Sequence, residues 1–343
     1  MANRSRVAAF GEVMMRLQVP GYELMSQADS LRYSFSGTGV NVGSALARFG
    51  HDSSLISRLP DNALGEAATA NLRKLGLSLE HVSRGGNYLG MYFLENGFGA
   101  RPGRVTYSNR QESSFNTAPP NAYDYDTIAA RIELVHFCGI TLAMNDNVRQ
   151  HMFQLAKAVK RNGGTVVFDC NYRPTHWGDG GYAKAKPHYE QMLELADIVM
   201  MNERDMIHIL GMSTDKTDRM EQLTELLPVI AQRFAGISVI AGTHRSINRD
   251  NSHSLRGFIY KYGALTIAPE PLTFAVYDRI GAGDAFASGI IHGELSAFEP
   301  ERTVRFATAA AMLAHTVAGD TPMSTVREIE RAMTDLANGD VIR

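Results

Sequence analysis

The chain has 343 residues, of which 44% are hydrophobic and 20% are charged, and its formal net charge is −2. This length can bury a large core, and the balanced charge argues against a general binder of nucleic acids or membrane surfaces. No apolar run is long enough to span a membrane and no signal-like segment opens the chain, so we predict a cytoplasmic protein with small-molecule partners.

Two regions near the amino terminus, residues 12–35 and 85–115, are polar, rich in tyrosine and alternating in hydropathy. Tyr88, Met91 and Phe93 illustrate the alternation. A period of two predicts antiparallel strands of a small sheet that is separate from the main one. Because both regions are inserted among β–α units, we expect them to form a lid over the carboxyl ends of the main strands.

The rest of the chain alternates short β-branched runs with helical patterns. The predicted buried strands span residues 134–138, 165–169, 197–201 and 237–241. The predicted helices span 148–161, 182–195, 203–210, 221–234, 284–295, 303–317 and 326–336, and Pro228 is expected to kink or restart one of them. This alternation predicts an α/β fold in which helices cover both faces of a mostly parallel sheet, within a single domain over residues 1–343.

The two cysteines, Cys138 and Cys170, both lie in apolar strand-like runs. Buried cysteines in a cytosolic protein stay reduced and pack as small apolar side chains. We therefore predict two free, buried thiols rather than a disulfide.

The most informative motif is the turn Gly281-Ala282-Gly283-Asp284, which runs into an apolar helix. Glycines without a Cβ let the backbone approach a ligand closely. The free N–H groups at a helix start bind anions such as a transferring phosphate, and a carboxylate in the first turn can accept a proton from a substrate hydroxyl. A plain capped turn has a similar pattern, so this motif alone does not decide the function.

Other motifs that identify enzyme classes do not occur in the sequence. There is no Walker-type phosphate loop, no dinucleotide fingerprint, no Gly-x-Ser-x-Gly elbow and no zinc-ligand spacing among the histidines. These patterns are typical of P-loop enzymes, dehydrogenases, α/β-hydrolases and zinc enzymes, which the sequence thus disfavours.

Three motifs together resemble those of the ribokinase-like (PfkB) carbohydrate kinases. Residues 278–286 resemble the family's carboxyl-terminal signature, Asp-Thr-x-Gly-Ala-Gly-Asp-x-Phe, and residues 36–42 its amino-terminal Gly-Gly-Ala-x-x-Asn-Val. Residues 202–205 stand where the family has Asn-x-x-Glu. The resemblance runs from about residue 10 to residue 317. It implies a ribokinase-like three-layer α/β/α domain with a small β-sheet lid, and a phosphotransferase that uses ATP and Mg²⁺.

Further segments look like one branch of that family, the 2-keto-3-deoxygluconate kinases. They are residues 11–17, 104–107, 113–115, 169–174, 243–245 and 315–320, together with the arginine at 279. The resemblance to this branch implies ATP-dependent phosphorylation of 2-keto-3-deoxy-D-gluconate at its 6-hydroxyl, which gives 2-keto-3-deoxy-6-phosphogluconate and ADP.

The resemblance also implies roles for individual residues. Asp284 is the expected general base, and the amides of Gly281, Ala282 and Gly283 are expected to stabilise the transferring group. The expected sugar-binding residues are Gly37, Asn41, Tyr107, Arg110, Arg173 and Asp284. The expected nucleotide-binding residues are Asn171, Asn202, Thr243, Arg245, Gly281, Gly283 and His315. Asp205 is expected to act on Mg²⁺ through water, and the use of a monovalent cation stays open.

A sugar acid brings a carboxylate into a partly dry pocket, where the charge requires a hydrogen-bonded cation. Arg110 follows Tyr107 in the predicted lid, and Arg173 follows a strand at the edge where open α/β sheets bind ligands. Each has an alternative interpretation: Arg110 as a solvated loop residue with Asn109 as its rival, and Arg173 as a structural partner of Asp169. Tyr107 could equally pack within the lid.

Other functions stay open at this stage. A kinase of the same fold could act on a neutral sugar, as fructokinases and 5-dehydro-2-deoxygluconokinases do, but such a substrate would leave Arg110 and Arg173 without a partner. A non-catalytic sugar or nucleotide sensor is a further alternative, although it has no need of a base at Asp284.

Three residues depart from the family pattern: Ser36, Gly39 and Asp205. The epimer preference is open, and exposed lid edges predict a homo-oligomer.

Overall fold

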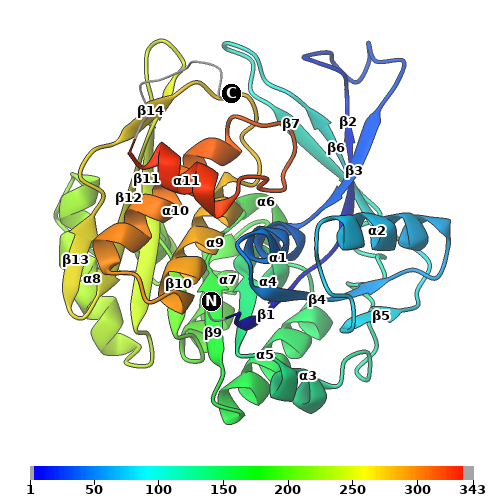
Figure 1. Ribbon diagram of the computed structural model, residues 1–343, viewed down its shortest axis with the longest axis horizontal. Helices are drawn as coiled ribbons and strands as arrows, with labels where there is room; N and C mark the ends of the chain where they lie inside the picture. The colour runs from blue at the N-terminus through cyan, green and yellow to red at the C-terminus, as the bar shows by residue number, and fades with distance from the viewer. Residues whose placement is uncertain (1–3, 335–343) are drawn as a thin grey trace.

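A mostly parallel sheet forms the centre of the computed structural model, which describes residues 4–334 (Figure 1). Its ten strands run in the order β13-β12-β11-β10-β9-β8-β1-β4-β5, with β14 paired to β12. From β5 to β11 all neighbours are parallel, and β12, β13 and β14 add an antiparallel edge. The strands are β1 (Arg6–Phe10), β4 (Asp52–Leu59), β5 (Val82–Arg84), β8 (Leu134–Cys138), β9 (Thr165–Asp169), β10 (Ile198–Met200), β11 (Val239–Ile247), β12 (His253–Lys261), β13 (Ala264–Ile267) and β14 (Leu272–Phe274).

Successive residues of the central strands point to opposite faces of the sheet, and each face is covered by helices. Val7 and Leu134 pack with one set of helices, whereas their neighbours Ala8 and Val135 pack with the other set. The first set is α1 (Thr38–Arg48), α9 (Ala282–Leu295), α10 (Pro300–Ala314) and α11 (Val326–Ala332). The second set is α3 (Tyr125–Arg131), α5 (Asp146–Arg161), α7 (Gly181–Leu193) and α8 (Arg219–Arg233). This arrangement confirms the predicted α/β/α fold.

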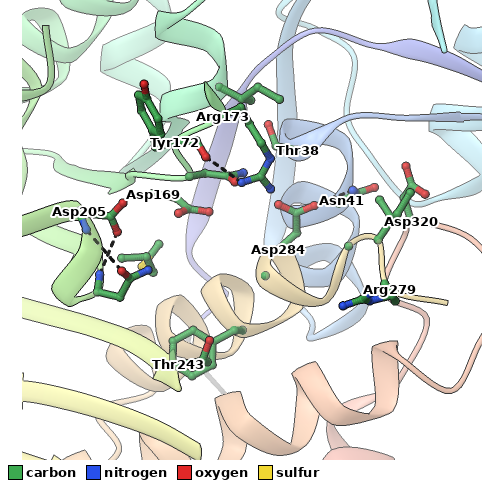
Figure 2. A pocket seen from close by; sticks show the side chains of 18 of the residues that line it. Thr38, Asn41, Asp169, Tyr172, Arg173, Asp205, Thr243, Arg279, Asp284 and Asp320 are labelled. Carbon is green, nitrogen blue, oxygen red and sulfur yellow. Dashed lines mark hydrogen bonds between the residues drawn. The ribbon is translucent and has the colours of Figure 1, made fainter. Parts of the chain in front are cut away.

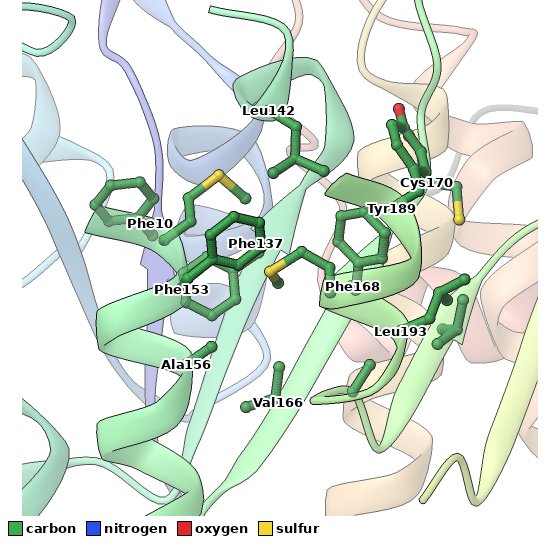
Figure 3. Packing of buried hydrophobic residues seen from close by; sticks show 14 of the residues in the cluster. Phe10, Phe137, Leu142, Phe153, Ala156, Val166, Phe168, Cys170, Tyr189 and Leu193 are labelled. Atoms are coloured by element: carbon green, nitrogen blue, oxygen red, sulfur yellow. The ribbon is translucent and has the colours of Figure 1, made fainter. Parts of the chain in front are cut away.

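The second face of the sheet is filled by aromatic and branched side chains (Figure 3). Phe137 and Phe168, on neighbouring strands, lie against Phe153 of α5 and Leu193 of α7. All of β8 and the apolar centre of β9, residues 166–168, are thus buried, as expected for a parallel sheet covered on both faces. A helix at the end of β4, α2 (Ala63–Lys74), completes a smaller cluster.

A second, four-stranded sheet projects away from the main one (Figure 1). Its order is β3-β2-β6-β7, with β2 (Met14–Gln18), β3 (Arg32–Ser36), β6 (Gly90–Glu95) and β7 (Arg104–Ser108). The prediction of an antiparallel lid is wrong for its central pair, because β2 and β6 are parallel. Each inserted region is an antiparallel pair, β2–β3 and β6–β7. The first strand of each pair follows a strand of the parallel main sheet, β1 or β5, and so both leave that sheet in the same direction.

The other predicted elements differ from the structure mainly at their ends. The strands at 134–138 and 165–169 are confirmed, while β11 is longer than predicted because it forms a hairpin with β12. Residues 205–209 form a π-helical turn, α8 continues without a break through Pro228, and the short helices α4 (Gly139–Leu142) and α6 (Pro174–Trp177) were not predicted. Residues 335–336, the predicted end of the last helix, lie outside the described residues.

Both cysteines, Cys138 and Cys170, are free and buried, which confirms the prediction for the thiols. Each lies at or just after the end of a central strand, where the side chain packs against the core. Among residues 4–334, no helix combines the length and the apolar character needed to cross a bilayer.

Candidate active site

A cavity of about 730 Å³ lies between the carboxyl ends of the central strands and the lid. The main sheet contributes Asp169 and Met200, the last residues of β9 and β10, and Gly242, which follows the part of β11 that pairs with β10. The lid contributes Met14, Ser36, Tyr92, Val105 and Tyr107. This is the edge at which open α/β sheets bind ligands, and it is where the sequence placed the lid.

The start of α9 forms one wall of the cavity. Gly281 is the residue before the first helical turn and has a φ of +84°, a conformation that favours glycine. A Cβ at Gly281 would collide with the backbone carbonyl of Asp320, whereas a Cβ at Gly283 would meet no atom within 4 Å. The first amides of α9 therefore adjoin open space inside the cavity, which is the arrangement that binds a phosphate.

Asp284 lies in the first turn of the same helix and is 6% exposed. The side-chain amide of Asn41 donates a hydrogen bond to its carboxylate at 2.7 Å, and the Thr321 hydroxyl holds Asn41 at 3.3 Å. Burial raises the pKa of Asp284 to about 7; the hydrogen bond from Asn41 and the charge of Arg173 oppose this rise, whereas Asp320 adds to it. A carboxylate whose pKa is near neutrality suits a general base.

Three further carboxylates, Asp169, Asp205 and Asp320, share the cavity, as Figure 2 shows. Burial, together with the charge of Asp284, raises the pKa of Asp169 to about 8. Burial also raises the pKa of Asp205 to about 6, although Asp205 accepts a hydrogen bond from the Asn202 amide at 2.9 Å. The acidic groups that line the cavity repel one another, so the cavity favours a ligand that brings a cation.

No group of three or more His, Cys, Asp or Glu side chains in residues 4–334 is arranged to enclose a metal ion. Mg²⁺ is often held through water and the oxygens of a bound phosphate rather than by a protein cage. The donor set here, with single carboxylates such as Asp205 beside an anion-binding helix start, fits that mode of binding.

Most of the residues predicted for the site lie together in this cavity. Those that line it are Gly37, Asn41, Tyr107, Asn171, Arg173, Asn202, Thr243, Asp205, Gly281, Gly283 and Asp284. Those that do not line it are Arg110, Arg245, Ala282 and His315. Ala282 still belongs to the first turn of α9, so the position of its backbone agrees with the prediction.

Arg110 does not reach the cavity, and its expected substrate contact is corrected. Its Nε donates to Glu12 at 2.8 Å and its Nη1 donates to His176 at 3.0 Å. The guanidinium also stacks on the ring of Tyr107, 4.8 Å from the centroid. The charge is thus already neutralised inside the lid, and the rival residue Asn109 does not line the cavity either.

His315 and Arg245, which were predicted to contact the nucleotide, do not line the cavity. His315 ends α10, where its Nδ1 pairs with the Ala311 carbonyl at 2.7 Å and its ring packs on Phe274. Arg245, on β11, is outside the cavity lining; partial desolvation of its guanidinium, with the charge of Arg279, lowers its pKa. Neither side chain lines the cavity, although both lie close enough to the lining residue Arg279 for its charge to lower their pKa.

Arg173 does lie in the cavity, beside Tyr172, whose carbonyl accepts its hydrogen bond at 3.1 Å (Figure 2). Within residues 4–334 it forms no ion pair, so the alternative of a structural pair with Asp169 is not what the structure has. Its charge acts on the nearby Asp169 and Asp284 without a direct salt bridge to either, so the guanidinium is available to bind an anion in the cavity.

Several lining residues were not predicted for the site, among them the polar residues Tyr92, Asp169, Arg279 and Asp320. Asp169 ends a predicted apolar strand, and that position is a signal that could have identified it. Arg279 lies two residues before Gly281, the start of the glycine turn, and this proximity was a weaker signal. Tyr92 comes from the lid, where no local pattern marks it; Asp320 comes from a late loop and ends the segment 315–320, whose resemblance to the kinase branch was a signal for it.

The comparisons with known proteins agree with this geometry. The pfkB family of carbohydrate kinases matches residues 4–240 and 252–326. A solved structure from Enterococcus faecalis, provisionally assigned as a 2-keto-3-deoxygluconate kinase, is 38% identical, with a TM-score of 0.93 and 98% of each chain covered. The 2-dehydro-3-deoxygluconokinase of Thermotoga maritima is 30% identical, with a TM-score of 0.92 and 97% of this chain and 99% of that one covered.

A curated relative points to the same class of substrate. The 2-dehydro-3-deoxygalactonokinase of Haloferax volcanii is 28% identical over 330 residues, which are 96% of each chain. The resemblance inferred from the motifs is confirmed by these matches. The chain therefore belongs to the pfkB family of carbohydrate kinases and is a phosphotransferase that acts on a sugar hydroxyl.

Proposed function

We propose that this kinase phosphorylates 2-keto-3-deoxy-D-gluconate at its 6-hydroxyl with ATP as the donor. The observation that carries the proposal is Arg173, a cation without an ion pair in residues 4–334 that shares the cavity with Asp284. The carboxylate of the substrate would pair with the Arg173 guanidinium. The sugar chain would then extend its 6-hydroxyl toward Asp284, the proposed base. The names of the relatives in Enterococcus and Thermotoga support the same sugar acid.

The chain's own residues perform the transfer in the following way. Asp284 accepts the proton of the sugar hydroxyl as that oxygen attacks the γ-phosphoryl group of ATP and ADP leaves. Asn41 holds the Asp284 carboxylate in place by its hydrogen bond. The amides of Gly281, Ala282 and Gly283 stabilise the negative charge that develops on the transferred group. Tyr107 and Gly37 line the sugar side of the cavity, and the lid excludes water from it.

The nucleotide and its metal fit the opposite side. Asn171, Asn202 and Thr243 line the cavity there, and Asp205 is available to a metal-bound water. The space free of atoms around Gly283 gives room for phosphate oxygens. When bound, Mg-ATP supplies the phosphoryl group and an electrophilic metal ion beside it.

Replacing Arg173 with methionine tests the substrate assignment. We expect the wild-type enzyme to prefer either epimer of the sugar acid over fructose, ribose and adenosine by about a hundredfold or more, because only the acid pairs with the arginine. In Arg173→Met the KM for the sugar acid rises at least about tenfold, whereas turnover of a neutral sugar is unchanged on the high-pH plateau, where Asp284 is deprotonated in both enzymes. ADP production measured across this panel of acceptors gives both results.

The matched control is Arg161→Met, which removes an exposed arginine of α5 that pairs with Asp126. An unchanged KM in Arg173→Met would contradict the carboxylate contact. A wild-type preference for fructose would favour the neutral-sugar kinase, and no turnover of any sugar would favour the non-catalytic sensor. The ratio of the kcat/KM values for the two epimers decides between a gluconate-type and a galactonate-type kinase.

We also propose that the whole chain, residues 1–343, forms one catalytic unit with lid segments at 12–35 and 85–115, and that it works in the cytoplasm. The strands β2–β3 and β6–β7 fall within or at the ends of these segments, which supports the division. The two free thiols support a reducing compartment.

The lid is proposed to join two copies of the chain. Tyr33 is 62% exposed and Phe98 is 67% exposed on the lid, and β3 and β7 are the edges of its sheet. Unpaired edges with exposed aromatic residues favour association with a second copy. We expect light scattering to give the mass of an oligomer for the wild type and a lower mass for Tyr33→Glu. Tyr262→Glu, in the distant turn between β12 and β13, should leave the mass unchanged; a monomeric wild type would contradict the proposal.

A further inference from the structure

One buried arginine connects the lid to the active-site loop. Arg16, in the centre of β2, is 1% exposed. Its guanidinium donates to Asp278 at 2.7 Å, to Asp320, and to Gln18 of the same strand at 2.8 Å. A single lid side chain therefore bridges two carboxylates that lie outside the lid.

The two carboxylates belong to loops that meet at the start of α9. Asp278 accepts hydrogen bonds from the backbone amides of Ile280 and Gly319, each at 3.1 Å. The carbonyl of Asp320 lies so close to Gly281 that the glycine cannot carry a Cβ. The loop before α9 and the loop after α10 are thus held as one body, and Arg16 is bound to both.

Two more lid strands converge on Asp320. Ser36, at the end of β3, donates to its carboxylate at 2.8 Å, and the hydroxyl of Tyr92 in β6 donates to the same oxygen. The residue after Asp320 is Thr321, which holds Asn41 and through it the carboxylate of Asp284. A continuous series of contacts therefore runs from the lid to the proposed base.

The charges in this cluster do not balance without Arg16. Burial opposes the charge of Arg16, but Asp320 and Asp278 raise its pKa well above the ordinary value. Without the guanidinium, two carboxylates would remain in a buried site with no cation. The charged or titratable groups that face Asp284 are Asp320, Arg173, Asp169 and Cys138. Of these, Asp320 is the one that Arg16 neutralises.

We propose that Arg16 is a positioning residue for phosphoryl transfer. It ties the loop before α9 to strand β2 of the lid through Asp278 and Asp320. This connection holds the anion-binding amides and Asp284 in the positions that phosphoryl transfer requires. Arg16 acts through Asp278 and Asp320 and does not itself contact the reacting atoms. The inference rests on the kinase activity and not on which sugar is the acceptor.

The test compares full-length Arg16→Met and Arg16→Lys with the wild type, using the acceptor that the wild type phosphorylates fastest. Arg16→Met is expected to lose at least about tenfold in kcat, with a smaller change in the KM of the sugar, because the loop is displaced. The midpoint of its pH–rate profile should move upward, since Asp320 is no longer neutralised. Arg16→Lys should recover part of both effects, because it restores one cation.

A matched control is Arg104→Met, which removes another lid arginine that pairs only within the lid, with Glu95. Hydrogen exchange adds a readout that needs no turnover: the amides of β2 and β6 should exchange faster in Arg16→Met than in Arg104→Met. If the wild type phosphorylates no sugar, the proposed substrate fails while this exchange experiment still reports on Arg16.

The inference is overturned if Arg16→Met keeps kcat within about twofold with an unshifted pH midpoint. It is also overturned if kcat falls equally in Arg104→Met, because the effect would then be general damage to the lid. Should Arg16→Met fail to fold, Arg16→Gln combined with Asp278→Asn keeps the net charge of the cluster. That variant is judged by the same kcat and pH criteria.

Discussion

Asp284→Asn is expected to lower kcat at least about a hundredfold, because an amide cannot accept the proton of the sugar hydroxyl. The substitution keeps the size of the side chain and one oxygen that can accept the hydrogen bond from Asn41, so the turn and the phosphate site stay intact. The affinity for ATP should therefore change little, which separates a lost base from a damaged site. Steady-state ADP production and calorimetric titration of the nucleotide measure the two quantities.

The same residue predicts a pH dependence. The base works only when deprotonated, so kcat/KM should fall as the pH drops below the raised pKa of Asp284, about 7, and reach a plateau above it. Arg173 lowers that pKa, and Arg173→Met should therefore move the midpoint upward. Near-wild-type turnover of Asp284→Asn, with the same pH midpoint, would rule out the role of base.

Gly281→Ala is expected to reduce kcat about a hundredfold or more, through the backbone rather than through a lost functional group. The φ of +84° costs an L-residue roughly 1–2 kcal/mol, and the new methyl group would meet the carbonyl of Asp320, a backbone atom that cannot rotate away. The loop must then shift, and the amides that bind the phosphate shift with it.

Two glycine controls separate these causes. Gly263→Ala introduces the same kind of strain at a φ of +75°, in a surface turn with no atom within 4 Å, and should leave activity unchanged. Gly283→Ala has neither strain nor a nearby atom, so the melting temperature should be unchanged and any loss of ATP affinity reports on the ligand itself. Gly281→Ala with wild-type kcat would mean that this loop does not position the phosphate.

The sequence predicted best what is encoded locally. Glycines and an acidic residue at a helix start fix the geometry around Asp284 within a few positions, and the apolar runs of β8 and β9 mark central strands unambiguously. Hydropathy alternation located the strands of the lid. It carries no information on strand direction, and the parallel pairing of β2 with β6 was therefore beyond its reach.

The errors arose where the partner of a residue is distant in the chain. Arg110 is neutralised by Glu12, 98 positions away, so an arginine that looked available for a substrate is already paired. Asp320 enters the cavity because two loops and three lid strands converge on it, and none of these contacts is local. The ring of His315 packs on Phe274, a residue of the unpredicted strand β14.

The bridge between Arg16 and Asp320 also bears on the order in which the molecule is assembled. The two residues are 304 positions apart, so Arg16 emerges from the ribosome long before its partner has been synthesised. Contacts of such separation carry a large loop-closure cost and form late in folding. The lid and the catalytic loop therefore reach their final arrangement only when nearly the entire polypeptide is present, and a prematurely terminated chain would lack one of the two carboxylates that complete the site.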